Sequence, residues 1–381
     1  MARHDVTSLA RQRRGRNSKD LDSKGAFMDG IFRAILAKTI GAGAILGTIL
    51  GVILGAAGAT SVFAQDKKPI ELRYTTGAPP KTPWTMQLER FAKDVEEESK
   101  GALKIEQFIA GQLGNEQDTA QQIARGRIDM GGFSNGAVAL LTPEISLLGL
   151  PFFFKDIAEQ DCTLDKHMTK PVSDALAKKG VKFLGWTEVG TGDIIGKRPF
   201  VSPKDVAGLK AASASNKVSA AMWTALGANP NMIGITEIAS AFQTGMVDVQ
   251  ASVVTFYLPS GLNKVAPVLT RIELSDAPGI IMMNKAKYDG LPKEQQAALD
   301  RAVERRSPAQ LRQEVRGFEA TLREMHLKGG GQIVEVTPAQ RDEWRKVLQP
   351  VWPTMVKELG ADGERFYTLL EAGRAACEKK S

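Results

Sequence analysis

The first clear pattern of apolar and polar positions predicts a strand followed by a helix. Glu71–Thr75 is predicted as the strand, and Thr82 followed by Pro83 is typical of an N-cap with proline in the first helical position. Apolar side chains then recur at i, i+4, i+7, i+8 and i+11, which is one face of a helix that Gly101 ends: Trp84, Leu88, Phe91, Ala92 and Val95. We interpret the tryptophan of this stripe as a core residue.

Strands and helices continue to alternate along the chain. Val181–Thr187 is predicted as a strand, and Asn216 begins a helix that Gly227 ends. Thr236 is predicted to cap the next helix. Strands separated by helices of this length predict βαβ units, and therefore an α/β fold with largely parallel sheets.

One short motif occurs twice, 119 residues apart, as Gly126–Met130 and as Gly245–Val249. Each copy ends a helix with glycine and starts a strand with a β-branched residue and an aspartate. Two similar α/β units predict two lobes, and the cleft between two lobes is where a small ligand binds. We interpret Asp129 and Asp248 as residues that start strands rather than as a catalytic pair.

The segment from Pro292 to Lys328 has a helical pattern over more than thirty residues, interrupted by Pro308. A helix rises about 1.5 Å per residue, so one of this length exceeds a small lobe. We expect it to bridge the two lobes, with a kink at the internal proline. Two more helices follow, one beginning at Thr337 and one around Phe366.

The charge of the chain is concentrated at its N-terminal end. Residues 1–64 carry nine Lys or Arg and four Asp or Glu, so they supply +5 of the total net charge of +7. The near-neutral remainder does not predict nucleic-acid binding. No charge occurs from residue 39 to residue 65, and Val62-Phe63-Ala64 fits a cleavage site, which predicts a secretory signal over residues 1–64.

An uncleaved membrane anchor is the alternative interpretation of these residues. Four glycines in the apolar run have the spacing that lets membrane helices approach closely: Gly43, Gly47, Gly51 and Gly55. Under either interpretation, residues 65–381 are placed outside the cytoplasm, in the periplasm.

Residues with catalytic chemistry are sparse in the sequence. It contains no HExxH, CxxC or GxxxxGK[ST] motif, and His167 and His326 lack metal-ligand spacing. We therefore predict no enzyme activity, no metal and no cofactor. Two interpretations stay open for Cys162 and Cys377: they form a disulfide in an oxidising compartment, or they are two buried thiols.

Six short motifs in order resemble the solute-binding proteins of tripartite ATP-independent periplasmic (TRAP) transporters, of the dicarboxylate-binding DctP type. The resemblance covers about residues 69–375 and is carried by the segments 110–116 (AGQLGNE), 124–130 (ARGRIDM), 148–156 (LGLPFFFKD), 197–210 (KRP through GLK), 226–230 (LGANP) and 237–248 (EIASAFQTGMVD).

The resemblance implies a two-lobed α/β fold that closes around a small organic solute and delivers it to TRAP membrane permease subunits. We assign residues 65–189 and 278–317 to lobe I, and residues 190–277 and 318–345 to lobe II. Residues 346–381 are expected to be helices that pack back across the lobes. A tethered receptor for a sensor system and, less favoured, a periplasmic enzyme on the same fold are the alternatives.

The chain departs from the resemblance at three polar positions. The arginine that grips the substrate carboxylate in the family aligns with Ala212, a second arginine aligns with Gly192, and an asparagine aligns with Ser252. An enclosed carboxylate without such a partner costs several kcal/mol. We therefore expect simple dicarboxylates to bind poorly, unless a cation from elsewhere substitutes: Lys81, Lys217 or Arg198.

Candidate ligand-binding residues are those in loops at strand ends, where clefts of α/β proteins are lined. They are Thr76, Gly77, Ser134, Asn135, Trp186, Asp193, Ala212, Ser213, Ser252, Thr255, Phe256 and Tyr257. Asp193 is the most specific candidate, because an acidic group there would meet a cationic or hydroxylated ligand.

Overall fold

The computed structural model describes residues 68–378, so the predicted signal or anchor of residues 1–64 lies outside the described residues. The strands are β1 Ile70–Thr76, β2 Leu103–Phe108, β3 Met130–Ser134, β4 Val181–Gly196, β5 Lys210–Ser213, β6 Asn229–Met232, β7 Val249–Val253, β8 Val268–Arg271, β9 Asp276–Asn284 and β10 Gln332–Glu335. Among the described residues, no helix is both long and apolar enough to cross a bilayer.

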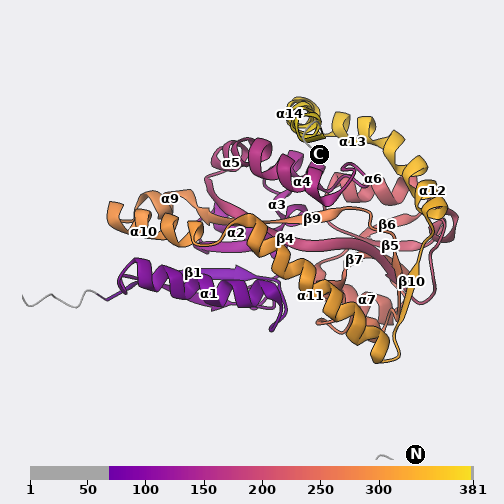
Figure 1. Ribbon diagram of the computed structural model, residues 1–381, viewed down its shortest axis with the longest axis horizontal. Coiled ribbons are helices and arrows are strands. Elements are labelled where there is room, and N and C mark those ends of the chain that lie inside the picture. Colours follow the sequence, from indigo (N-terminus) through magenta and orange to yellow (C-terminus); the bar gives the residue numbers. More distant parts are fainter. Residues whose placement is uncertain (1–67, 379–381) are drawn as a thin grey trace, which may run out of the picture. The chain divides into compact units, whose positions relative to one another are not determined.

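Helices connect and cover these strands (Figure 1). They are α1 Pro83–Glu98, α2 Glu116–Ala124, α3 Asn135–Val138, α4 Ile157–Thr163, α5 Thr169–Ala177, α6 Lys217–Ala225, α7 Ile238–Gln243, α8 Val254–Tyr257, α9 Lys285–Asp289, α10 Lys293–Glu304, α11 Pro308–Lys328, α12 Pro338–Leu348, α13 Trp352–Glu358 and α14 Gly360–Glu378.

The strands form two groups that share β4, in the order β2-β1-β3-β9-β4-β7-β5-β6, with β8 pairing β4 and β10. From Val181 to Thr191, β4 is antiparallel to β9, and from Gly192 to Gly196 it is antiparallel to β7. These two groups are the cores of the two lobes. The sheet is mixed rather than largely parallel as predicted, because β4 and β9 run antiparallel between the lobes.

Lobe boundaries at 189/190 and 277/278 are predicted from sequence. The change of partner along β4 and the step from β8 into β9 lie within a few residues of them. The boundaries themselves remain a prediction.

The predicted long helix is two helices. α10 ends at Glu304, and Pro308 occupies the first position of α11. The side chain of the N-cap residue Ser307 accepts a hydrogen bond from the backbone N–H of Gln310 at 3.3 Å. Proline is well suited to a first helical turn, because its missing N–H is not needed there. The prediction of one kinked helix was therefore wrong.

α11 still connects the two lobes. Near its start, the Leu311 carbonyl accepts a hydrogen bond from Gln87 of α1 at 2.9 Å. Near its end, Leu322 packs into the apolar cluster that contains Phe242 and Tyr257. Figure 1 shows the helix running from the side that carries α1 and α10 to the side that carries β10.

Local capping signals identify most helix starts. Thr82 and Thr337 precede α1 and α12, and Asn216 precedes α6, as predicted. Thr236 is the exception, because it lies inside a short 3-10 turn, Ile235–Glu237, and the α-helix begins only at Ile238.

The repeated aspartates have the structural role predicted for them. Asp129 Oδ2 accepts the backbone N–H of Arg73 at 2.7 Å, and Asp248 Oδ2 accepts that of Lys210 at 3.0 Å. Each carboxylate thus satisfies a backbone donor of the neighbouring strand, in the middle of β1 and at the first residue of β5. Neither residue lines the cavity described below.

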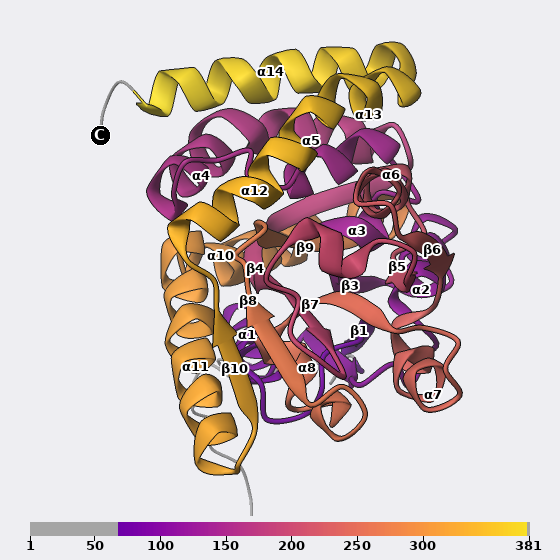
Figure 2. The same cartoon turned by 90° about the vertical axis from the view of Figure 1, so that its right-hand side faces the viewer.

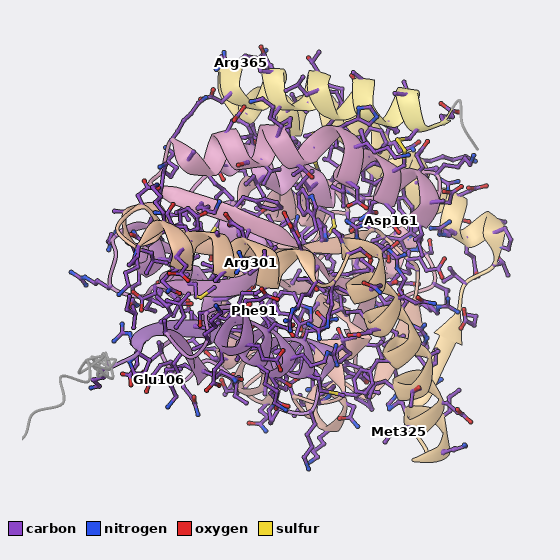
Figure 3. The ribbon with its side chains drawn as sticks, turned by 60° about the vertical axis from the view of Figure 1, so that its left-hand side comes forward. Phe91, Glu106, Asp161, Arg301, Met325 and Arg365 are labelled. Atoms are coloured by element: carbon purple, nitrogen blue, oxygen red, sulfur yellow. A yellow bond between two sulfur atoms is a disulfide. The ribbon has the colours of Figure 1, made fainter. Side chains whose placement is uncertain are left out.

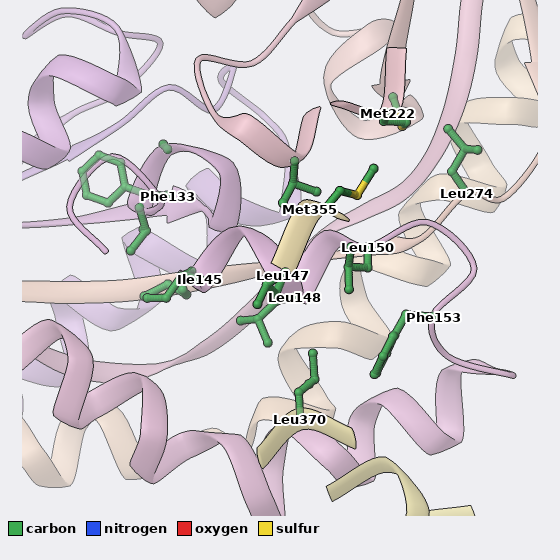
Figure 4. Close-up of a cluster of buried hydrophobic side chains, with 14 of the residues drawn as sticks. Phe133, Ile145, Leu147, Leu148, Leu150, Phe153, Met222, Leu274, Met355 and Leu370 are labelled. Carbon is green, nitrogen blue, oxygen red and sulfur yellow. The ribbon is translucent and has the colours of Figure 1, made fainter. Parts of the chain in front are cut away.

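The C-terminal helices share the largest apolar core with residues from both groups of strands. Figure 4 shows Leu147, Leu148, Leu150 and Phe153 meeting Met355 and Leu370. The LPFFF segment is therefore core. Figure 2 shows α14 lying across α4 and α5.

A disulfide fastens this C-terminal layer. Cys162 of α4 and Cys377 of α14 are joined across a sequence separation of 215 residues, with Cα atoms 5.9 Å apart, and the yellow bond lies near the C-terminal end of α14 in Figure 3. Of the two interpretations left open by the sequence, the structure has the disulfide.

Candidate ligand-binding site

A cavity of about 300 Å³ lies where strands of the two groups end. Its walls come from the ends of β1 and β3 on one side, from β5, β7 and α8 on the other, and from α11 at Val315. Both lobes and the connecting helix therefore contribute to one space, which is the arrangement predicted for a cleft between lobes.

Most of the predicted site residues line this cavity. They are Thr76, Gly77, Ser134, Asn135, Ala212, Ser213, Ser252, Thr255 and Phe256. The structure brings these residues together, and their contact with a ligand remains a prediction.

Three predicted site residues lie elsewhere. Trp186 donates its indole N–H to Thr169 Oγ1 at 2.8 Å and lines a separate cavity beside α10 and α11. Tyr257 is fully buried and donates its hydroxyl to the Ala266 carbonyl at 2.7 Å. We remove both from the candidate set, together with Asp193.

Asp193 is fully buried, and its Oδ1 accepts the backbone N–H groups of Ile272 and Glu273 at 2.9 and 3.0 Å. Successive residues of a strand face opposite sides, and the preceding Gly192 is the one that lines the cavity. Burial raises the pKa of the Asp193 carboxyl to about 7. Its role is to hold the segment after β8 against β4.

Glu116 is the ionisable residue in the cavity wall. It follows the N-cap Asn115 at the start of α2 and belongs to the QLGNE motif. Its Oε1 accepts the Ser134 hydroxyl at 2.5 Å and its Oε2 accepts the Ser134 backbone N–H at 3.2 Å. Burial raises the pKa of this carboxyl, whereas the two hydrogen bonds from serine lower it by a smaller amount.

Two glutamine side chains of the wall have an amide oxygen without a partner. They are Gln117 of α2 and Gln250 of β7, so one belongs to each lobe. A buried polar atom without a hydrogen bond costs free energy, so these two side chains are incompletely satisfied in the wall.

The remaining wall is largely apolar and includes two tryptophans. Trp84 donates its indole N–H to the Glu188 carbonyl, and a methyl group on Gly279 would lie 2.6 Å from its ring, so only glycine leaves room for it. The larger apolar residues are Trp84, Met222, Trp223, Ile233, Ile238, Phe256, Leu274 and Val315.

No Lys, Arg or His is among the wall residues in the part of the chain that the structure describes. The three cations considered as substitutes for the family arginine lie elsewhere. Lys81 is exposed, Lys217 donates to the Glu358 carbonyl at 2.9 Å, and Arg198 donates to the Asp205 carbonyl at 2.6 Å.

Buried charges connect α11 to β4 beside the cavity. Glu319 Oε1 accepts the Thr191 backbone N–H at 2.8 Å, and the Thr191 hydroxyl donates to Asp276 at 2.7 Å. Burial raises the pKa of both carboxyls. A side chain on Gly190 would lie 2.4 Å from Glu319, so glycine is needed where the helix approaches the strand.

Sequence reasoning missed several wall residues. Trp84 was interpreted as core, and Glu116 was noticed only as part of a motif. The two glutamines gave no signal, because an unpartnered amide is visible only once the surrounding walls are known.

No group of three or more candidate metal ligands occurs in residues 68–378.

Comparison with known proteins defines the class. Residues 74–359 match the family model of the bacterial extracellular solute-binding proteins, family 7, named DctP. The chain therefore belongs to this family, and the resemblance to TRAP solute-binding proteins is confirmed.

Individual relatives agree with this assignment. The 2,3-diketo-L-gulonate-binding periplasmic protein YiaO of Escherichia coli is 31% identical over 211 residues, which are 55% of this chain and 64% of that protein, slightly less than two thirds.

Solved structures also match. A TRAP periplasmic solute-binding protein from a Sulfitobacter species, with bound β-D-galacturonate, has a TM-score of 0.74 and 25% identity, covering 80% of this chain and 100% of the other. The sugar acid binding protein DctPAm of Advenella mimigardefordensis, in complex with galactonate, has a TM-score of 0.77 and 25% identity, covering 83% and 100%. The two-lobed α/β fold and the solute-binding class are thus confirmed.

Proposed function

We propose that the chain works in the periplasm, where it captures a small organic solute by closing its lobes and delivers it to TRAP membrane permease subunits. The observation that carries this proposal is a cavity whose walls come from both lobes and from α11. Closure is a shift of population toward a state that the ligand favours.

Two further observations support a location outside the cytoplasm. The relatives are periplasmic binding proteins. The Cys162–Cys377 disulfide suits an oxidising compartment, because cytosolic thiols are kept reduced. The homologous proteins bind solutes rather than turn them over, and we extend this to the chain. Within residues 68–378, no observation favours the tethered receptor or the enzyme.

Ligand-dependent compaction tests the proposal. The protein is screened by thermal shift against organic acids, amines, sugars and aromatics, since a ligand that binds only the folded state raises Tm by mass action. Any solute that raises Tm is then followed by small-angle scattering. We expect the radius of gyration to fall on saturation. Tm shifts without compaction, or no shift with any class of solute, would contradict capture by lobe closure.

A further inference from the structure

The cavity wall has one carboxamide from each lobe. Gln117 from lobe I and Gln250 from lobe II line the cavity, and each residue is only 9% exposed, with its amide oxygen buried in the wall without a hydrogen-bond partner. Because the two carboxamides belong to different lobes, a ligand that hydrogen-bonds to both would hold the lobes together. The Glu116 carboxylate adds an acceptor on the lobe I side.

A carboxamide by itself does not decide the ligand's charge, since it can turn over and present its N–H₂ group instead. The charges of the wall decide it. Glu116 is acidic, and no wall residue described by the structure is a Lys, Arg or His. A ligand carboxylate enclosed here would lose its water without gaining a cation, and it would meet another carboxylate.

Two backbone amides next to the cavity already have hydrogen-bond partners. At the start of α3, the Ala137 N–H donates to the Ser134 hydroxyl at 3.2 Å. At the start of α6, the Ser219 N–H donates to the Asn216 side chain at 2.9 Å. The capping side chain therefore occupies one helix-end amide at each of these two sites.

We propose that the solute captured in this cavity is neutral or cationic, that it hydrogen-bonds to the Gln117 and Gln250 carboxamides, and that it places an apolar part against the tryptophan-containing wall. This inference rests on the proposed function and specifies its ligand class. It separates the chain from the solved TRAP proteins mentioned above, whose bound ligands are sugar acids.

Isothermal titration tests the inference by comparing acids with neutral or cationic compounds of the same carbon skeleton. The pairs are D-galacturonate with D-galactose, and succinate with succinamide and 1,4-diaminobutane. In each set the carbon skeleton is kept while the carboxylates are removed or replaced. For the wild-type protein we expect neither acid to bind more tightly than its partners.

Introducing an arginine into the cavity wall provides the decisive test. Ser252→Arg places a guanidinium in the wall from β7, and Ala212→Arg does so from the adjacent β5, in case one variant does not fold. We expect either folded variant to bind galacturonate or succinate at least about tenfold more tightly than the wild type, roughly 1.4 kcal/mol. The affinities for galactose and succinamide should not rise.

Two outcomes would overturn the inference. One is an acid that binds the wild type at least about tenfold more tightly than its neutral partner. The other is a pair of folded arginine variants that gain no affinity for either acid. An acid that binds tightly and compacts the wild type leaves the proposed function intact, whereas a protein that no solute compacts removes the proposed function itself.

Discussion

Arg316 of α11 donates from Nε to Glu188 of β4 at 2.9 Å, and its two terminal nitrogens each donate to Asp161 at 2.8 Å. The same Glu188 supplies the backbone carbonyl that accepts the indole N–H of Trp84 in the cavity wall. One guanidinium therefore joins the connecting helix α11, the strand β4 shared by both lobes, and α4.

Arg316→Met should strongly destabilise the protein. It leaves the Glu188 side chain, which is 2% exposed, without a cation, and removing one partner of a buried ion pair costs roughly 3–5 kcal/mol. Burial raises the pKa of Glu188 to about 7 even with Arg316 present. Loss of the arginine should therefore raise this pKa further and favour the protonated acid. Urea unfolding of the variant measures the loss.

The double variant Arg316→Met with Glu188→Gln should recover part of that stability, because the remaining group is then neutral. Arg365→Met is the matched control, since that arginine pairs with Asp362 on the surface and both side chains are more than half exposed. Equal losses for Arg316→Met and Arg365→Met would disprove the importance of the buried network.

Asp193→Asn should change how stability depends on pH. The folded-state pKa of Asp193 is raised from 3.8 to about 7, so between these values the native state holds a proton that the unfolded state lacks. Stability from this group is then present at low pH and is lost as pH rises toward 7, by up to about 1.4 kcal/mol per pH unit.

The comparison is between unfolding free energies of the wild type and Asp193→Asn at pH 4.5 and pH 7.5. Glu188 contributes a slope of the same sign, so only the difference between the two proteins isolates Asp193. We expect the variant to gain stability relative to the wild type as pH rises. A difference that stays constant, or one that moves in the opposite direction, refutes the raised pKa.

Local signals predicted much of the fold, since a cap acts over a few residues. Thr82 with Pro83 and Thr337 with Pro338 identified helix starts correctly. The same logic applies at Pro308, where Ser307 and Gln310 form a capping box that was overlooked. The antiparallel pairing of β4 with β9 joins segments far apart in the sequence, and no local pattern specifies it.

Only the part of the site that is formed by the loops at strand ends was predictable from the sequence. Loops after β1, β3, β5 and β7 do line the cavity, but which residue faces it along β4 was not predictable. The register of β4 against β9 shifts between Phe183 and Gly185 and again between Glu188 and Gly190. Each irregularity interrupts the alternation of faces, so counting from Trp186 does not give the direction of Asp193.

Removing the disulfide should weaken the fold but not the ligand site. Cys162→Ser with Cys377→Ser opens a covalent link across 215 residues, and links across long loops typically contribute about 2–5 kcal/mol. We expect a loss of this size in urea unfolding and unchanged solute affinity, since neither cysteine lines the cavity. Reductant should destabilise the wild type but not the double serine variant. An equal effect on both proteins would show that the reductant does not act through this disulfide.

Gly111→Ala should oppose lobe closure. This glycine follows β2 in lobe I, and a methyl group on it would lie 3.3 Å from Thr236 Cγ2 of lobe II and 3.3 Å from the Gly114 carbonyl. Its φ of +72° also favours glycine. The substitution therefore adds backbone strain, of roughly 1–2 kcal/mol, and crowds a contact between the lobes beside Ile235 of the cavity wall.

Gly101→Ala separates these two effects. Gly101 has a similar φ of +79°, but a methyl group there meets no atom within 4 Å. We expect similar losses of unfolding free energy for both variants, and a larger radius of gyration by small-angle scattering only for Gly111→Ala. Because the strain is matched, scattering curves that coincide would show that a methyl group facing Thr236 does not oppose lobe closure.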